Sequence, residues 1–153
     1  MLYRLLREDE SIQNGLSAKN VDAKKSVFAH VLIGSNWEWE SQYISTCGSM
    51  KAVLLLDPYC RDRRIVKIWE KNLPVIKIDL RTEENRKMYF MDRKCRDQIL
   101  FNKYAKTRDE VLLVGHVPET HVELLTDSDI RSGKLPIFNI AGVEDTCTDN
   151  EIQ

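Results

Sequence analysis

Short apolar segments that hold or adjoin an isolated polar residue recur along this chain of 153 residues. Segments of this length and composition are typical of β-strands. Three of them carry polar residues that a strand buries only when they have partners: Arg4, the Ser45-Thr46 pair and Glu110. The chain must therefore build a sheet in which these positions, far apart in the sequence, either face solvent or form a site.

The sequence predicts a series of short strands, because each run is apolar or β-branched and is bounded by turn-forming residues. These strands span Leu2–Leu6, Gln42–Thr46, Ile65–Trp69, Val75–Leu80, Val111–Val114, His121–Leu125 and Ile137–Ile140. Asn36–Ser41, where Trp37 and Trp39 flank an acid, is expected to be an exposed strand or a binding loop.

Helical spacing of apolar residues predicts a helix over Lys24–Ile33, capped by Asp22 or Ser26, and another over Met50–Leu56 after Ser49. A longer helix is predicted over Glu83–Lys106. Its cap is expected to be Asp92, and its buried stripe to comprise Cys95, Ile99, Leu100 and Tyr104.

Helices early and midway, with short strands concentrated late, lack the regular alternation of a βαβ protein and indicate an α+β fold. One domain is expected over residues 1–143, followed by a polar tail over residues 144–153. Hydrophobic residues make up 42% of the chain and charged residues 31%, which is typical of a folded, soluble domain. The net charge of −1 argues against a nucleic-acid binder that works by bulk electrostatics.

Cys47, Cys60, Cys95 and Cys147 lack the paired spacing of a structural metal site, so we expect free thiols and no structural metal. We predict neither a secretory signal nor a membrane-spanning run, and therefore no membrane association. Together these features predict an intracellular, cytoplasmic protein.

The polar residues beside the strands suit one reaction, the cleavage of the glycosidic bond between nicotinamide and ribose in NAD. A carboxylate such as Glu110 stabilises the sugar cation that develops as nicotinamide leaves. The guanidinium of Arg4 suits a phosphate or ribose, and small hydroxyl residues can support the acid without filling the pocket. No glycine-rich dinucleotide or phosphate-binding motif is present, so NAD would bind to a fold other than the Rossmann type.

Three motifs resemble those of the ADP-ribosyltransferase superfamily, in its order and rough spacing. Tyr3-Arg4 resembles the first-strand arginine, residues 43–47 (YISTC) the Ser-Thr-Ser strand, and residues 108–113 (RDEVLL) the strand that opens with the catalytic glutamate. The resemblance is to the class with an Arg-Ser-Glu triad. It implies an α+β domain with a split, mixed or antiparallel β core and flanking helices.

The resemblance also implies roles for individual residues. Arg4 would contact the NAD phosphate or ribose, and Glu110 would hold a ribose hydroxyl and stabilise the cation. Ser45 would hydrogen-bond and position Glu110, while Thr46 would support the strand or the nicotinamide side. Tyr3 is placed with Arg4 in the NAD-binding set.

Other residues have two interpretations each. Tyr43 either stacks near nicotinamide or points into the core, and His30 is either a buried structural histidine or part of the NAD site. Trp37 and Trp39 either pack at an edge or form the wall of a pocket. Cys47, at the third position of the Ser-Thr-Ser motif, is expected to be a small buried thiol.

Arg108 departs from the pattern of family members that modify arginine, which carry a second acid at this position. A guanidinium there would repel an arginine acceptor. We therefore expect NAD as the substrate and a different acceptor: another protein side chain, a nucleic-acid group, or water, which would make the protein an NAD glycohydrolase. The alternatives are an RNA 2′-phosphotransferase of the same fold, and a non-catalytic member that binds a nucleotide or a protein.

Overall fold

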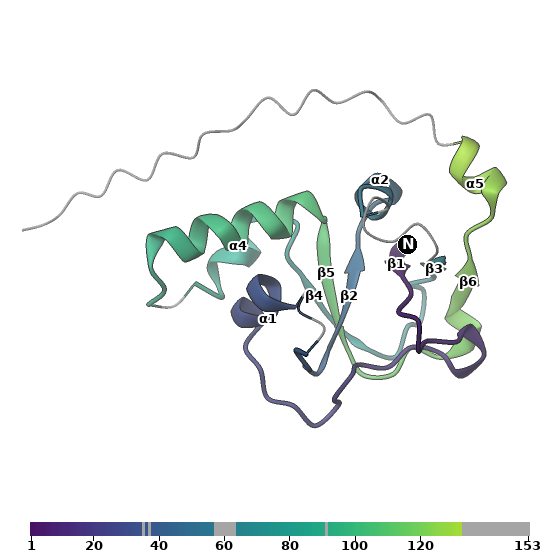
Figure 1. Ribbon diagram of the computed structural model, residues 1–153, viewed down its shortest axis with the longest axis horizontal. Coiled ribbons are helices and arrows are strands. Elements are labelled where there is room, and N and C mark those ends of the chain that lie inside the picture. The colour runs from purple at the N-terminus through teal and green to yellow at the C-terminus, as the bar shows by residue number, and fades with distance from the viewer. Residues whose placement is uncertain (35, 37, 57–63, 91, 133–153) are drawn as a thin grey trace, which may run out of the picture.

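The computed structural model describes residues 1–34, 36, 38–56, 64–90 and 92–132, which form a six-stranded antiparallel sheet with flanking helices (Figure 1). The strands are β1 (Leu2–Leu5), β2 (Tyr43–Cys47), β3 (Ile65–Ile68), β4 (Ile76–Asp79), β5 (Glu110–Val114) and β6 (Val122–Leu124). They lie in the order β4-β5-β2-β1-β3-β6. The α+β class is confirmed, and every pairing among the described strands is antiparallel rather than mixed.

The two central strands, β1 and β2, meet at a single register pair, Tyr3 with Cys47. By contrast, β2 pairs with β5 along its whole length, from Tyr43 opposite Val114 to Cys47 opposite Glu110. The sheet therefore has two well-paired halves, β4-β5-β2 and β1-β3-β6, which join at a narrow seam. Arg4 and Ser45 stand directly beside that seam.

The helices are α1 (Val27–Ile33), α2 (Met50–Leu54), α3 (Glu83–Lys87), α4 (Cys95–Thr107) and α5 (Asp127–Ser132), with short 3₁₀ turns η1 (Ile12–Asn14) and η3 (Glu119–His121). Two predicted caps are confirmed. The hydroxyl of Ser26 accepts a hydrogen bond from the amide of Ala29, and that of Ser49 accepts one from the amide of Ala52, so each serine starts its helix.

The long helix predicted over residues 83–106 is wrong, because the structure divides it into α3 and α4. The ring of Phe90, between the two helices, turns into the core and packs edge-on against Phe28. Lys94, rather than Asp92, occupies the N-cap position of α4. The residues that α4 buries fully are Phe101 and Ala105, whereas Cys95, Ile99, Leu100 and Tyr104 of the predicted stripe are only partly buried.

Two further predictions are corrected by the strand positions. The strands are not concentrated late, because β1 and β2 occur in the first third of the chain and form the centre of the sheet. The described residues among positions 36–41 form no strand. Of the two predictions for this segment, an exposed strand or a loop, the loop therefore remains. The strand predicted over 137–140 and the tail over 144–153 lie outside the described residues.

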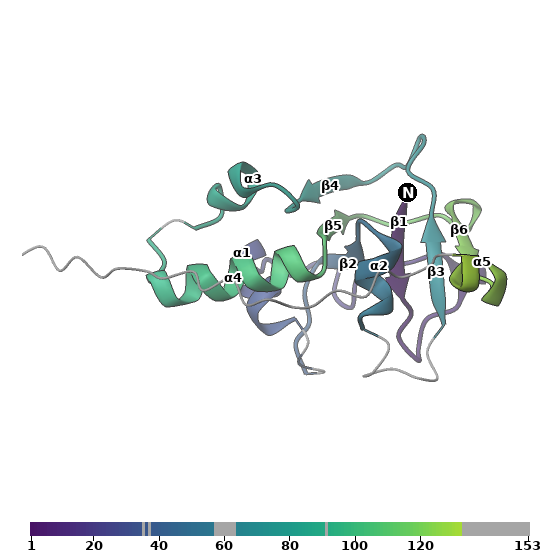
Figure 2. The ribbon, with the colours of Figure 1, turned by 90° about the horizontal axis from the view of Figure 1, so that it is seen from above.

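One face of the sheet is covered by two separate groups of helices. Figure 2 shows α1 and α4 together at one end of the sheet and α2 over its centre. The first group packs through Phe28 and Phe101 onto Leu112, and the second through Val53 onto Cys47. Leu112 and Cys47 lie on the same face, because β2 and β5 pair Ser45 with Leu112 and Cys47 with Glu110. Ser45 and Glu110 lie on this same face, beside Leu112 and Cys47.

The opposite face is closed by the segment that follows β1. Leu16 and Ala18 pack on Leu6, Ile44 and Val66 to form the largest cluster of buried apolar residues. This segment is joined to the residues that follow β5 through paired backbone hydrogen bonds between Leu16 and Val117. The segment that follows β1 thus acts as a cover segment, and it anchors the Arg4 side of the seam.

Cys95 is disulfide-bonded, so the prediction of free thiols is wrong for this residue. Cys47 is free and buried, and Cys60 and Cys147 lie outside the described residues. No helix in the described part of the chain is long and apolar enough to cross a membrane.

Replacement of Phe101 by alanine tests the packing that positions α1 over the sheet. The Phe101 ring is fully buried, stacks on Phe28 at 4.9 Å and meets Phe90 edge-on. We expect Phe101→Ala to lower the free energy of unfolding by roughly 3–5 kcal/mol, measured by urea denaturation. Met88→Ala, at a residue that is 71% exposed, should change it by less than about 0.5 kcal/mol. Equal effects of the two substitutions would contradict the assignment of Phe101 to the core.

Candidate functional site

An open cavity of about 1020 Å³ lies between α2 and the pair formed by α1 and α4. All residues predicted from the sequence to form the site line it: Tyr3, Arg4, His30, Tyr43, Ser45, Thr46 and Glu110. They come from β1, α1, β2 and β5. More than half of the length of the chain separates the first of these elements, β1, from the last, β5. Other lining residues include Trp39 and Ser41 before β2, and Tyr104 and Arg108 at the end of α4.

Glu110 is the most deeply buried acid of the described chain, at 2% exposure. Burial raises the pKa of Glu110 to about 7, although the nearby charge of Arg108, a hydrogen bond from Ser45 and the charge of Arg4 each act to lower it. The carboxyl group is therefore divided between its neutral and charged forms near neutral pH. Any positive charge brought into the cavity would shift it toward the carboxylate.

Asp109 fixes the position at which the chain enters β5. It adopts a positive φ of 45°, which turns the chain sharply between α4 and Glu110. Its carbonyl accepts a hydrogen bond from Gly48 at 2.7 Å, and its carboxylate accepts one from the hydroxyl of Ser49 at 2.6 Å. Since Ser49 also caps α2, the start of β5 and the start of α2 are held together beside the cavity.

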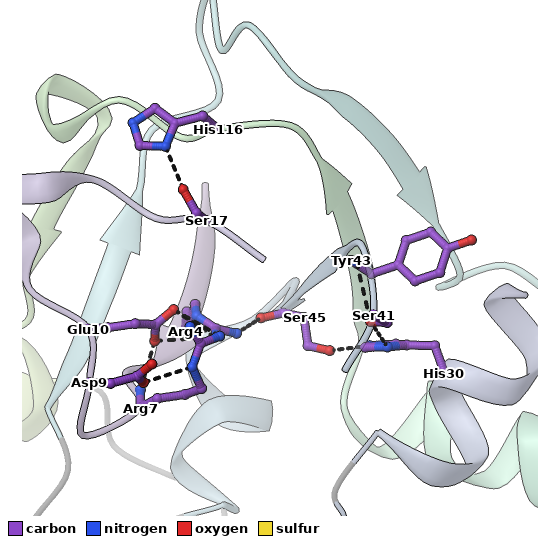
Figure 3. A network of polar contacts seen from close by, with 10 residues as sticks. All are labelled: Arg4, Arg7, Asp9, Glu10, Ser17, His30, Ser41, Tyr43, Ser45 and His116. Atoms are coloured by element: carbon purple, nitrogen blue, oxygen red, sulfur yellow. Dashed lines mark hydrogen bonds and ion pairs between the residues drawn. The ribbon is translucent and has the colours of Figure 1, made fainter. Parts of the chain in front are cut away.

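Arg4 crosses the seam between β1 and β2. Its Nη1 donates to the backbone carbonyl of Ser45 at 2.6 Å, and its Nη2 donates to both carboxylate oxygens of Glu10, at 2.9 and 3.2 Å (Figure 3). Glu10 also accepts a hydrogen bond from the amide of Arg7 at 2.7 Å. The Nε of Arg4 is buried without a partner among the described residues. The guanidinium is thus held in place within the protein, and its Nε can still donate to a ligand.

His30 connects α1 to β2 and to the loop before it through its two ring nitrogens. Its Nε2 lies 2.7 Å from the hydroxyl of Ser45, and its Nδ1 lies 2.7 Å from the hydroxyl of Ser41 (Figure 3). Burial, with the charges of Arg108 and Arg4, lowers the pKa of His30 to about 4. The imidazole is therefore neutral at physiological pH.

Tyr43 and Thr46 are engaged in structural contacts at the margin of the cavity. The phenol of Tyr43 donates to the carbonyl of Lys25 at 2.8 Å, and its ring meets His30 edge-on at 5.2 Å. The hydroxyl of Thr46 donates to the carbonyl of Val111 at 2.6 Å, which ties β2 to β5. These contacts agree with core packing for Tyr43 and with support of the strand for Thr46.

Trp39 forms part of the cavity wall, one of its two interpretations from the sequence, while Trp37 lies outside the described residues. The indole Nε1 of Trp39 is buried and has no partner among the described residues, and the amine of Lys25 lies 4.9 Å from the centre of its ring. A buried donor without a partner beside a cavity is suited to a ligand acceptor. Cys47 is the inert thiol that was expected, because burial raises its pKa to about 12.

Two important residues were missed in the sequence. Ser41 had a usable signal, since it is in phase with Tyr43 and Ser45 and therefore points to the same side of an extended chain. Glu10 had none, because it stands in a polar segment among other charged residues. His116, another histidine of the chain, does not line the cavity and bonds to Ser17 at 2.8 Å.

Comparisons with protein-family models, with curated proteins and with solved structures find no match to this chain. No group of three or more histidine, cysteine, aspartate or glutamate residues suited to a metal ion occurs within the described ranges. The interpretation of the site therefore depends on its own geometry.

Glu10→Ala tests whether the carboxylate holds Arg4 in place. Both side chains are more than nine-tenths buried, so removal of Glu10 leaves an uncompensated guanidinium. We expect the free energy of unfolding to fall by roughly 3–5 kcal/mol in urea denaturation. Asp9→Ala is the matched control, because Asp9 pairs with Arg7 at the surface and should contribute at most about 1 kcal/mol. A Glu10 variant no less stable than the Asp9 variant would refute the buried pair.

Glu110→Gln tests the raised pKa of the buried acid. Because the folded state binds the proton of Glu110 more tightly than the unfolded state, the contribution of Glu110 to stability is fully present below about pH 4.5 and is lost as pH rises through about 7. Glutamine does not titrate, so the variant should become progressively more stable than wild type across this window, by on the order of 2–3 kcal/mol at pH 8. Thermal unfolding at several pH values measures the difference, and a pH-independent difference would contradict it.

Proposed function

We propose that this chain binds NAD in the cavity and cleaves the bond between nicotinamide and ribose, transferring ADP-ribose to an acceptor or to water. The observation that carries the proposal is Glu110, a buried carboxyl group at the floor of the cavity. Ser45 and Arg4 act on it from two neighbouring strands, and its pKa lies near neutrality. An acid held in this setting is costly to stability and is typical of functional sites.

The chemistry needs a carboxylate beside the ribose. When the bond from the ribose C1′ to the ring nitrogen breaks, its electron pair leaves with neutral nicotinamide, and positive charge develops on the sugar. The charged form of Glu110 stabilises that cation by electrostatics and accepts a hydrogen bond from a ribose hydroxyl. Water or an acceptor group then forms the new bond to C1′ and loses its proton.

The substrate itself would favour the charged form of Glu110. NAD carries a positive nicotinamide ring, and a positive charge near a buried carboxyl lowers its pKa. Arg4 Nε and Trp39 Nε1, which are buried without partners among the described residues, then supply hydrogen bonds to phosphate, ribose or carboxamide oxygens. The cavity of about 1020 Å³ is large enough for a dinucleotide half and more.

Arg108 lines the same cavity and its charge acts on both Glu110 and His30. A guanidinium at this place repels a second guanidinium, so arginine is not the proposed acceptor. A neutral or acidic protein side chain, a nucleic-acid group and water remain compatible with it.

The alternatives have support of their own. The cavity gathers basic residues that were not expected together, Arg4, Arg7, Lys19 and Arg108, as an RNA 2′-phosphotransferase would require. However, Glu8, Asp9 and Glu110 line it as well and offset much of this charge. A non-catalytic nucleotide-binding protein is favoured by Arg4, whose terminal nitrogens are already bound to Glu10 and Ser45.

Nicotinamide release tests the proposal directly. Wild-type protein incubated with NAD should release nicotinamide, and Glu110→Gln should lower the rate by roughly 10²–10³-fold, because the neutral amide cannot stabilise the sugar cation. The control is Glu119→Gln, at an exposed acid outside the cavity, which should retain the wild-type rate. Release should be measured with and without candidate protein and nucleic-acid acceptors.

Three outcomes would contradict the assignment. Equal rates for wild type and Glu110→Gln would remove Glu110 from the reaction. Calorimetric binding of NAD without any release would support the non-catalytic alternative, and transfer of an RNA 2′-phosphate would support the phosphotransferase.

A further inference from the structure

A line of hydrogen bonds runs from the loop before β2, through α1, to the floor of the cavity. It begins at Ser41, passes through both ring nitrogens of His30 and continues to Ser45, each contact measuring 2.7 Å. Ser45 and Glu110 are diagonal neighbours on the same face of the paired strands β2 and β5, both line the cavity, and the hydroxyl of Ser45 acts to lower the pKa of the Glu110 carboxyl group. Ser41 and His30 are 4% and 7% exposed, so these polar groups depend on one another rather than on water.

The neighbours of Ser41 determine the direction of the protons. The Ser41 oxygen accepts a hydrogen bond from the amide of Tyr43 at 3.3 Å, and its own proton has His30 Nδ1 as its acceptor among the described residues. If Nδ1 carried the imidazole proton, the buried hydroxyl of Ser41 would have nothing to donate to. Nδ1 is therefore the acceptor, and the single proton of the neutral ring lies on Nε2.

The same count of donors and acceptors determines the hydrogen bonds at the Ser45 end of the line. With its proton on Nε2, His30 donates to the oxygen of Ser45, and the proton of Ser45 is then free to be donated to Glu110. In the opposite tautomer, Ser45 would donate to His30 and could not stabilise a carboxylate. The tautomer of one imidazole thus decides whether Glu110 has a donor.

We infer that His30 is a positioning residue that, as the neutral Nε2–H tautomer held by Ser41, keeps the hydroxyl of Ser45 directed at Glu110. Both ring nitrogens are used inside the protein, so His30 contributes no nitrogen to a ligand. Its consequence for NAD cleavage rests on the proposed function, but the hydrogen-bond arrangement itself does not.

The charges around this line of hydrogen bonds also favour a neutral His30 and an ionised Glu110. Arg108, from the end of α4, and Arg4, from β1, face both His30 and Glu110, and they disfavour a proton on each. Tyr43 of β2 places its ring edge-on against His30, and Cys47, also of β2, lies close to Glu110 as an undissociated thiol. Because His30 is neutral, a substitution at position 30 can remove the contact that Ser45 makes with Glu110 without changing the charge of the site.

Asparagine and glutamine at position 30 separate the two ends of the imidazole. The amide of glutamine reaches the place of Nε2 and can still donate to Ser45, whereas that of asparagine reaches only the place of Nδ1. Removal of the donor should raise the pKa of Glu110 by about one in His30→Asn, and leave it close to wild type in His30→Gln.

Nuclear magnetic resonance on the protein without NAD measures both quantities. Imidazole nitrogen shifts report the tautomer of His30, and the side-chain carboxyl carbon of Glu110 reports its pKa during a pH titration. A proton on Nδ1, or an unchanged Glu110 titration in folded His30→Asn, would overturn the inference. Ser41→Ala provides a second variant, in which loss of the Nδ1 partner should mix the tautomers and raise the pKa of Glu110; an unmixed tautomer would also overturn it.

The rate of nicotinamide release then separates this inference from the proposed function. The pH at which release reaches half of its maximum should move upward by about one in His30→Asn and be restored in His30→Gln. A protein that shows the expected tautomer and titrations but releases no nicotinamide would refute the proposed reaction and leave the positioning role of His30 intact. A pH profile that does not move in an active His30→Asn variant would refute the role.

Discussion

The burial of the Glu110 carboxyl group is the constraint on which the arrangement of this protein depends. A carboxylate taken out of water needs donors or opposite charge, and without them it is neutral or the fold is lost. Here Ser45 supplies the donor, while Arg108 and Arg4 supply the charge. These three residues belong to different elements, so β1, β2 and the end of α4 must all meet at the start of β5. The narrow seam between β1 and β2 is where that meeting occurs.

A second buried acid sets the other side of the seam. Glu10 holds the guanidinium of Arg4, and Arg4 holds the backbone of Ser45, so the cover segment after β1 is tied to β2. This explains why a single register pair is enough to join the two halves of the sheet. It also means that Arg4 acts mainly as a fixed positive charge beside the cavity, while its Nε has no partner among the described residues.

The elements that the sequence predicts well are those decided by local contacts. Alternation and β-branching locate β1, β2 and β5, and Ser26 and Ser49 start their helices because a serine hydroxyl can reach an amide three residues later. The order of Arg4, Ser45 and Glu110 also predicts that they share a cavity. The break between α3 and α4 is not local, because it depends on Phe90 packing against Phe28. The pairing of Glu10 with Arg4 and the contacts of His30 likewise arise only when α1 and the cover segment pack on the sheet.

These buried groups couple ligand charge to proton binding. If the pKa of Glu110 in the free protein is about 7, a ligand that carries positive charge into the cavity must expel a proton from Glu110 at neutral pH. By reciprocity, the affinity for that ligand rises with pH until the carboxyl group is ionised. A reduced, uncharged nicotinamide ring gains nothing from this coupling. With NAD as the proposed substrate, this coupling would favour the oxidised over the reduced dinucleotide by electrostatics, and Ser45, which lowers the pKa of Glu110, would set the pH at which the preference begins.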